Sequence, residues 1–284
     1  MKDMGPINYC LGIEFKCTKT KIQMCQKKYI EDLLEKYKMT NCRTVTTPVE
    51  VGLKLDKRPS DAEEPQVPYR SLIGSLMYLA VATRPDIAFA VNSLSQFNES
   101  YGTEHWKAAK RVLRYLNGTL EYGLVFKKTE EPIQGFCDAD WGNCGTDRRS
   151  YSGYFFRFGG AAITWEARKQ RTVALSSVEA EYMALAEAAR EATYLKNFLR
   201  NIGYQTDSIN VKCDSQGAKM LAENPVHHAR SKHIDIKHHF VRQALEDGVL
   251  NISYLPTSEM PADVLTKGLP REKHNFCRDG LGVF

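Results

Sequence analysis

Residues 133–141 read IQGFCDADW, and this stretch decides the fold of the C-terminal half of the chain. Its side chains alternate in the way that is typical of a β-strand, which places Asp138 and Asp140 on one face. Aspartate is depleted in strands, because its short carboxylate competes for the backbone and resists burial. The strand therefore either lies at a sheet edge with a solvated face or carries a metal-binding carboxylate.

The segments that follow predict a mixed α/β domain. Strands are expected near residues 152–158, 162–165 and 171–175, with the turn Gly159-Gly160 between the first two, and this spacing indicates a meander. Further on, the pattern predicts an alanine-rich helix, a strand, two helices, a strand and a short helix, at 178–199, 209–213, 215–223, 230–246, 250–255 and 262–267. This order predicts a mixed sheet with flanking helices.

The N-terminal half predicts a small α+β region. Residues 8–17 and 22–26 favour a hairpin, and 28–37 favour a helix. A proline-rich connector over 44–68 precedes three expected helices, at 69–82, from about 86 to 97, and at 104–117. The last of these carries a basic face that is either solvated or lies along a phosphate backbone, formed by Lys107, Lys110, Arg111 and Arg114.

Composition sets the broad class of protein. The 284 residues are 43% hydrophobic and 26% charged, which suits a soluble globular chain. The net charge of +5 is compatible with a polyanionic partner. The eight cysteines form no Cys-x-x-Cys pair, which indicates reduced thiols in an intracellular protein of the cytoplasm or nucleus. No stretch has the length of a membrane span, and residues 1–6 are not expected to be a signal peptide.

Four acidic residues fall at the ends of strands or the starts of helices, namely Asp138, Glu179, Asp214 and Asp263. Each has a structural interpretation. Glu179 completes a capping box with Ser176, Asp214 stands where the N-cap of the next helix belongs, and Asp263 suits the positive end of a helix dipole. Together, they occupy the places where an open α/β sheet gathers its site residues. Converging carboxylates need a cation, and two Mg²⁺ or Mn²⁺ ions about 4 Å apart suit phosphodiester hydrolysis.

A set of short motifs resembles the ribonuclease H domain of copia-type LTR retrotransposon Pol polyproteins. The motifs are CDADW (137–141), DRRS (147–150), ALSSVEAEY (174–182), CDSQ (213–216), KHIDI (232–236), HFVR (239–242) and PAD (261–263). Earlier, MKDMGP (1–6) and LGIE (11–14) resemble the end of the reverse transcriptase palm and its thumb. YRSLIG (69–74) and TRPDI (83–87) resemble the connection region. The resemblance implies a thumb-like remnant at 1–58, a helical connection at 59–131 and a ribonuclease H-like domain at 132–284.

The resemblance implies a magnesium-dependent endonuclease that cuts the RNA strand of an RNA–DNA hybrid. Asp138, Glu179, Asp214 and Asp263 would then be both the catalytic residues and the ligands of two Mg²⁺ ions. Glu181, two positions along the same helix, is expected to point elsewhere. The implied partners are the hybrid and a complete reverse transcriptase, with no membrane. Implied phosphate contacts, for which a solvated surface is an equal alternative, are Arg148, Arg149, Lys169 and Arg171.

The sequence departs from the family pattern in two places. It has no Tyr-x-Asp-Asp turn, so no polymerase activity is expected, and Met1 matches an internal methionine of the family, which suggests a reading frame that starts inside a fragmented element. The loop at 256–261 also lacks the histidine that many ribonucleases H place before the last aspartate. The alternative function is a noncatalytic remnant that binds nucleic acid or a partner protein.

Overall fold

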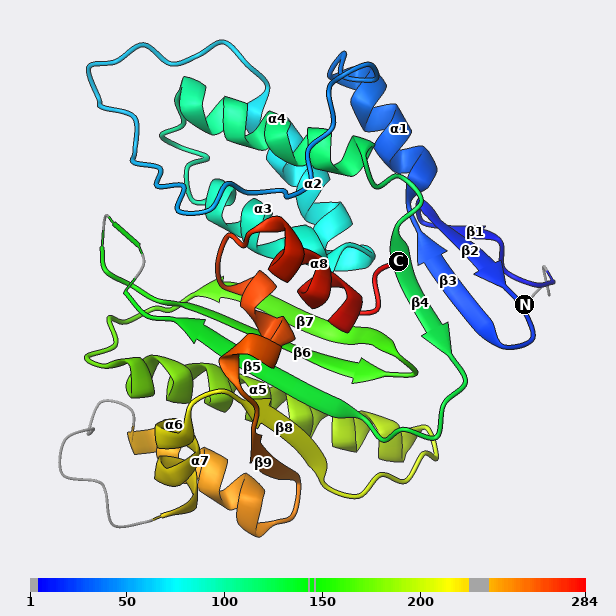
Figure 1. Cartoon of the computed structure of the whole chain (residues 1–284), viewed down its shortest axis with the longest axis vertical. Helices are drawn as coiled ribbons and strands as arrows, with labels where there is room; N and C mark the ends of the chain where they lie inside the picture. The colour runs from blue at the N-terminus through cyan, green and yellow to red at the C-terminus, as the bar shows by residue number, and fades with distance from the viewer. Residues whose placement is uncertain (1–4, 143, 146, 225–234) are drawn as a thin grey trace. The chain divides into compact units, whose positions relative to one another are not determined.

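The computed structural model describes residues 5–142, 144–145, 147–224 and 235–284 (Figure 1). The chain divides into two compact units. Unit 1 comprises residues 1–129, 159–161 and 268–284, and unit 2 comprises 130–158 and 162–267. The expected thumb-like and connection regions thus lie almost entirely in unit 1, together with the last 17 residues of the chain, from 268 to 284.

Unit 2 is built on a mixed sheet of five strands in the order β7-β6-β5-β8-β9. Strand β5 pairs antiparallel with β6 and parallel with β8, and β8 pairs parallel with β9. The strands span Gln134–Asp140 (β5), Tyr151–Phe158 (β6), Ala161–Lys169 (β7), Ile209–Cys213 (β8) and Leu250–Tyr254 (β9). The β5–β8 ladder ends where Cys137 pairs with Cys213. Because the two strands are parallel, the residues that follow, Asp138 and Asp214, come at the same edge of the sheet.

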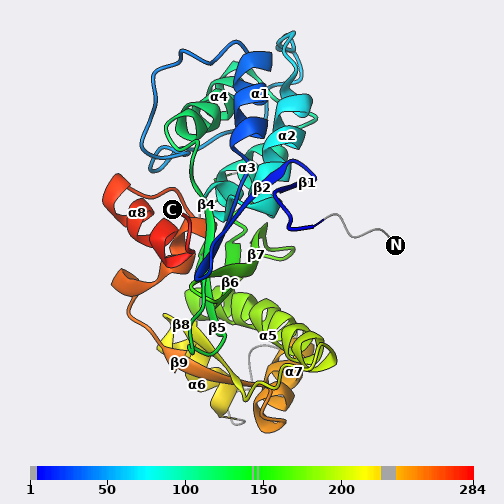
Figure 2. The same cartoon turned by 90° about the vertical axis from the view of Figure 1, so that its right-hand side faces the viewer.

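Helices cover the sheet of unit 2. The long helix α5 (Ser177–Asn201) runs along the sheet and packs on β5, β6 and β8 (Figures 1 and 2). Helices α6 (Gln216–Glu223) and α7 (Asp235–Glu246) pack against α5. The face of α5 toward the sheet is alanine-rich, which lets the helix approach closely, and its fully buried alanines are Ala180, Ala184, Ala188, Ala189 and Ala192.

The structure corrects several sequence-based boundaries in unit 2. The expected strand at 162–165 is part of the longer strand β7, whereas residues 171–175 form no strand. The buried Gln170 amide donates to Ser152 Oγ at 2.8 Å and to Ala180 O at 2.9 Å, so side-chain bonds take over where the ladder stops. The expected helix at 262–267 is the 3-10 helix η4 (Pro261–Leu265). Residues 230–234 of the expected helix at 230–246 lie outside the described residues.

Unit 1 combines a small sheet with a group of helices. Its four strands lie in the order β1-β2-β3-β4 and span Tyr9–Cys10, Ile13–Cys17, Lys21–Cys25 and Gly123–Lys127. The expected hairpin is β2–β3, whereas β4 had no signal in the sequence analysis. The helices are α1 (Lys27–Lys36), α2 (Tyr69–Ala82), η1 (Pro85–Ile87), α3 (Ala88–Ser95), α4 (Thr103–Asn117) and α8 (Arg271–Gly280).

A buried polar network holds the helices of unit 1 together. Arg84 is fully buried, and its guanidinium forms two hydrogen bonds to Asp86, at 2.9 and 2.8 Å. The Tyr115 hydroxyl donates to the same carboxylate at 2.7 Å, and His274 Nε2 lies 3.0 Å from that hydroxyl oxygen. Each buried charge therefore has a partner, which is the condition for burying it at all. The network links η1, α4 and α8, three segments that are far apart in the sequence.

Candidate metal centre at the edge of the sheet

Three of the four predicted acids come together at one edge of the unit 2 sheet. Asp138 lies on β5 and is 1% exposed, Asp214 directly follows β8, and Asp263 lies in η4 and is 2% exposed. Glycine makes this possible on the neighbouring strand. A Cβ atom at Gly153, which pairs with Asp138, would lie 2.6 Å from Leu265 Cβ. The missing side chain lets η4 lie directly on β6 and places Asp263 near Asp138.

A lysine lies between two of these carboxylates. Lys267 Nζ is 2.7 Å from Asp263 Oδ1 and 3.6 Å from Asp138 Oδ2. The Thr266 hydroxyl donates to the same oxygen of Asp138. Lys267 follows Asp263 by four residues, so both side chains lie on one side of the turn. Neither Lys267 nor Thr266 was predicted from the sequence. The spacing of four residues was a usable signal for the lysine, whereas nothing in the sequence pointed to the threonine.

Glu181 is the glutamate that faces the aspartates. Its Oε1 atom accepts a hydrogen bond from Ala139 N at 3.1 Å, just beyond the point where the β5–β8 ladder ends. Glu181 is 8% exposed, and its Oε2 atom has no hydrogen-bond partner among the described residues. Ligand atoms of Glu181, Cys213 and Asp214 all lie within 4.8 Å of one another. Glu181 thus joins the edge at which Asp138 and Asp214 lie.

The structure places Glu179 elsewhere, which corrects the sequence-based assignment. The backbone N–H of Glu179 donates to Ser176 Oγ at 3.2 Å. The side-chain oxygen Glu179 Oε2 accepts from Leu175 N at 3.0 Å. The carboxylate therefore closes the capping box at the start of α5. Residues two apart on a helix point in nearly opposite directions, so only one of the two glutamates can face β5. The capping box with Ser176, already visible in the sequence as the structural interpretation of Glu179, is the role that these two bonds support.

Asp214 does not cap the next helix. Ser215 is the N-cap of α6, and its hydroxyl accepts from Ala218 N at 3.1 Å. Asp214 Oδ2 instead accepts from the Thr257 hydroxyl at 2.7 Å. Thr257 lies in the loop where a histidine is expected from the family pattern, so this loop still reaches the acidic edge. No feature of the sequence identified Thr257 beforehand.

Burial and mutual repulsion raise the pKa values of Asp138 and Glu181. Burial, with the charges of Asp263 and Asp214, raises the pKa of Asp138 to about 7, although Lys267 and Thr266 oppose the change. Burial also raises the pKa of Glu181 well above its usual range, and the nearby Asp138, Cys213 and Asp214 add to the effect. Both carboxyl groups therefore hold protons more tightly than in water, and a bound cation would reverse this.

The predicted phosphate contacts lie next to the sheet edge or in the loop after β5. Arg148 has a positive φ of 56° and is exposed, as is Arg171. Lys169 Nζ lies 2.9 Å from Asp147 Oδ2, and Arg149 Nε lies 3.7 Å from the same oxygen. Asp147 thus forms ion pairs with two of the four predicted phosphate contacts, Lys169 and Arg149. Their contact with phosphate stays a prediction.

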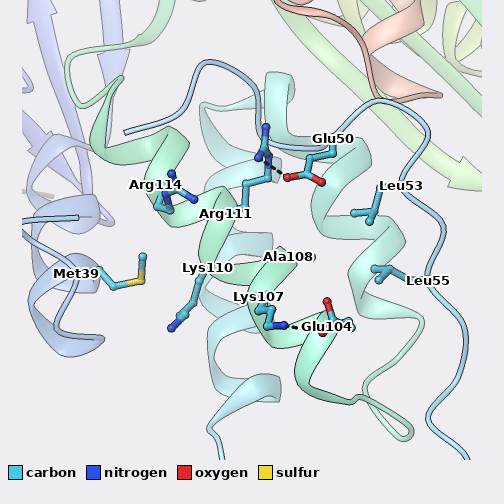
Figure 3. A pocket seen from close by; sticks show the side chains of 10 residues that line it. All are labelled: Met39, Glu50, Leu53, Leu55, Glu104, Lys107, Ala108, Lys110, Arg111 and Arg114. Carbon is cyan, nitrogen blue, oxygen red and sulfur yellow. Dashed lines mark hydrogen bonds and ion pairs between the residues drawn. The ribbon is translucent and has the colours of Figure 1, made fainter. Parts of the chain in front are cut away.

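The basic face of α4 lines an open pocket of about 460 Å³ within unit 1 (Figure 3). Arg111 Nη1 lies 2.7 Å from Glu50 Oε1, and Lys107 Nζ lies 2.7 Å from Glu104 Oε1. The opposite wall carries apolar side chains, including Leu53 and Leu55 (Figure 3). Because these two cations already have acidic partners, the pocket gives no specific support for phosphate binding.

Among the described residues, no helix is both long and apolar enough to cross a bilayer.

Unit 2 has the strand order β7-β6-β5-β8-β9, and its acids gather at the ends of β5 and β8 and beside η4. These features define unit 2 as a ribonuclease H-like domain. Residues 1–51 match the family described as "Reverse transcriptase (RNA-dependent DNA polymerase)". The whole chain is 43% identical to the retrovirus-related Pol polyprotein from transposon TNT 1-94 of Nicotiana tabacum, and 39% identical to that from transposon RE1 of Arabidopsis thaliana. The chain belongs to the Pol polyprotein family of copia-type retrotransposons.

The matches also define how much of each relative the chain represents. It covers 22% of the length of the tobacco polyprotein and 19% of that of the Arabidopsis one. Among solved structures, LC11-RNase H1 in complex with an RNA/DNA hybrid is similar to 47% of this chain and is itself covered to 93%. That similarity has a TM-score of 0.37 at 17% sequence identity.

Proposed function

We propose that unit 2 is a magnesium-dependent endonuclease that cuts the RNA strand of RNA–DNA hybrids. The observation that carries the proposal is the convergence of four carboxylates, those of Asp138, Glu181, Asp214 and Asp263, at one edge of the sheet. Like charges this close keep some of the group protonated unless a cation joins them. Membership of the Pol family supports a role in the replication of a retroelement.

The residues fit a hard divalent cation. Carboxylate oxygens are the ligands that Mg²⁺ and Mn²⁺ prefer, and Glu181 Oε2 is buried without a hydrogen-bond partner among the described residues. When bound, two such ions supply an activated water and neutralise the leaving oxygen of a phosphodiester. The fit therefore rests on the types of donor atom present and on an oxygen that lacks a partner.

Each residue of the centre has a part in preparing the site. Ala139 N holds Glu181 Oε1, and Glu181 Oε2 has no hydrogen-bond partner among the described residues. Thr257 orients Asp214, and Thr266 orients Asp138. The Lys267 ammonium group offsets the repulsion between Asp138 and Asp263 and so keeps two buried carboxylates close together.

The substrate and partners follow from the same proposal. Selectivity for a hybrid would come from the 2′-hydroxyl of the RNA strand and from groove shape, because a ribonuclease of this kind does not read base sequence. Arg148, Arg149, Lys169 and Arg171 are the proposed phosphate contacts. The product would carry a 5′-phosphate and a 3′-hydroxyl. We also propose a complete reverse transcriptase as a partner of this chain and an intracellular site of action.

The test is cleavage of an end-labelled RNA–DNA hybrid by the full chain in Mg²⁺. Asp138→Asn and Glu181→Gln should each lower the rate by at least about a thousandfold, or about 4 kcal/mol of activation free energy. Glu179→Gln is the matched control, because it changes the same side chain two residues away and should leave most of the rate. Equal cutting by the parent and Asp138→Asn would remove the enzyme and favour the noncatalytic remnant that binds nucleic acid or a partner protein.

A further inference from the structure

One cysteine lies inside the acidic edge. Glu181, Cys213 and Asp214 each offer a ligand atom, and these atoms lie within 4.8 Å of one another. Cys213 is fully buried at the end of β8. Sulfur distinguishes this group from the proposed Mg²⁺ ligands, because Mg²⁺ selects oxygen whereas Zn²⁺ and Cd²⁺ bind thiolate together with carboxylate. The edge therefore holds a second combination of donor atoms with a different metal preference.

One member of this group has a buried oxygen without a hydrogen-bond partner. Glu181 is 8% exposed, and its Oε2 atom has no hydrogen-bond partner among the residues that the structure describes, while Oε1 is held by Ala139 N at 3.1 Å. A buried polar atom without a partner is unfavourable, because folding removes its hydrogen bonds to water and replaces them with none. A cation bound by Oε2 would remove this cost.

Geometry distinguishes Cys213 from the neighbouring cysteine. Cys213 Sγ accepts a hydrogen bond from Ser215 N at 3.4 Å and lies 3.8 Å from Ser215 O. Cys137, which pairs with Cys213 on the adjacent strand, donates its thiol hydrogen to Lys212 O at 3.6 Å. Among the described residues, Cys213 belongs to the group of possible ligand atoms and Cys137 does not, so Cys137 is the matched control.

We propose that Glu181, Cys213 and Asp214 form a binding site for a thiophilic divalent cation of the Zn²⁺ class. On binding, the S–H bond of Cys213 breaks and its proton passes to solvent. A sulfur–metal bond forms and displaces one water from the hydrated ion, and the two carboxylates displace others. No electron is transferred. Because the cation takes two of the proposed Mg²⁺ ligands, it blocks hydrolysis, and this last consequence alone rests on the proposed function.

The test uses Cd²⁺ as the probe, because thiolate-to-Cd²⁺ charge transfer gives an ultraviolet band that carboxylates do not. The parent for this experiment is the full chain with its exposed and half-buried cysteines replaced by serine, at Cys10, Cys17, Cys42 and Cys144. The remaining cysteines are all buried, at Cys25, Cys137, Cys213 and Cys277. Variants in this background are Cys213→Ser, the control Cys137→Ser, and Asp214→Asn.

We expect the parent and Cys137→Ser to show the band with one Cd²⁺ bound, and Cys213→Ser to lose it. Asp214→Asn, which keeps every thiol, should bind Cd²⁺ at least about tenfold more weakly. This variant therefore tests the site even if Cys213→Ser fails to fold. No band in the parent, a band that survives in Cys213→Ser, a band lost in Cys137→Ser, or unchanged affinity in Asp214→Asn would each overturn the site.

Hybrid cleavage then separates this inference from the proposed function. Zn²⁺ added to the Mg²⁺ reaction should inhibit the parent at a concentration at least about tenfold lower than that needed for Cys213→Ser. A protein that shows the Cd²⁺ band but never cuts the hybrid keeps the cation site and loses the nuclease. Equal inhibition of the two proteins by Zn²⁺, with cutting intact, overturns the blocking role.

Discussion

The two glutamates of α5 predict opposite effects of one chemical change. In the absence of metal, Glu181→Gln should stabilise the protein, whereas Glu179→Gln should destabilise it. Glu181 is 8% exposed, lies near Asp138 and Asp214, and has one oxygen without a hydrogen-bond partner among the described residues. The neutral amide keeps an oxygen for Ala139 N and removes a buried negative charge.

The magnitude follows from the cost of that charge. Burial raises the pKa of Glu181, so the stability contributed by its protonated form is present at low pH and is lost as the pH rises through the folded-state value. At pH 8 the glutamine variant should be more stable by about 1–3 kcal/mol, the cost of a buried polar group without a partner. Glu179→Gln removes a negative charge from the start of a helix, which should cost about 0.3–1 kcal/mol.

The assay is urea unfolding at pH 8 in EDTA, followed by tryptophan fluorescence in a Trp106→Phe background. Trp141 and Trp165 then report on unit 2 alone. The Glu181→Gln advantage should shrink toward pH 5 and reverse when Mg²⁺ is added, because only the parent binds it fully. Destabilisation by Glu181→Gln in EDTA, with no effect of Glu179→Gln, would refute the reasoning and return the ligand role to Glu179.

Three further predictions concern the neighbours of the centre and the buried network. Lys267→Met should lower metal-free stability by about 1–3 kcal/mol and raise the melting-temperature increase produced by Mg²⁺, since two carboxylates lose their counter-charge; an unchanged melting curve would contradict this. Gly153→Ala should cost about 1–3 kcal/mol and weaken Mg²⁺ binding measured by calorimetry, because the added Cβ overlaps Leu265. Burial lowers the pKa of His274 to about 4, so the stability of its neutral form is lost as the pH falls from about 6.5. His274→Gln should therefore remove about 3 kcal/mol of the loss between pH 7 and 4, measured by urea unfolding.

Local patterns were sufficient for most of the framework. The strand at 209–213 and the helix at 69–82 were predicted with the boundaries that the structure has, because apolar periodicity and flanking turns mark both ends. Asp138 was likewise placed in a strand, Asp214 at the end of a strand and Asp263 at the start of a short helix. Strand β4 and helix α8 had no local signal, since their partners lie about 100 residues or more away in the sequence.

By itself, the sequence determined most of the elements, the positions of the three aspartates along the chain and the family to which the motifs point, because each rests on short-range pattern. The tertiary structure alone decided which glutamate joins them. Glu179 and Glu181 have the same side chain on the same helix, and the outcome depends on how α5 lies on β5, where Ala139 N needs an acceptor beyond the end of the ladder. Lys267, Thr257 and Cys213 enter the centre for the same reason, since packing between distant segments decides which side chains meet.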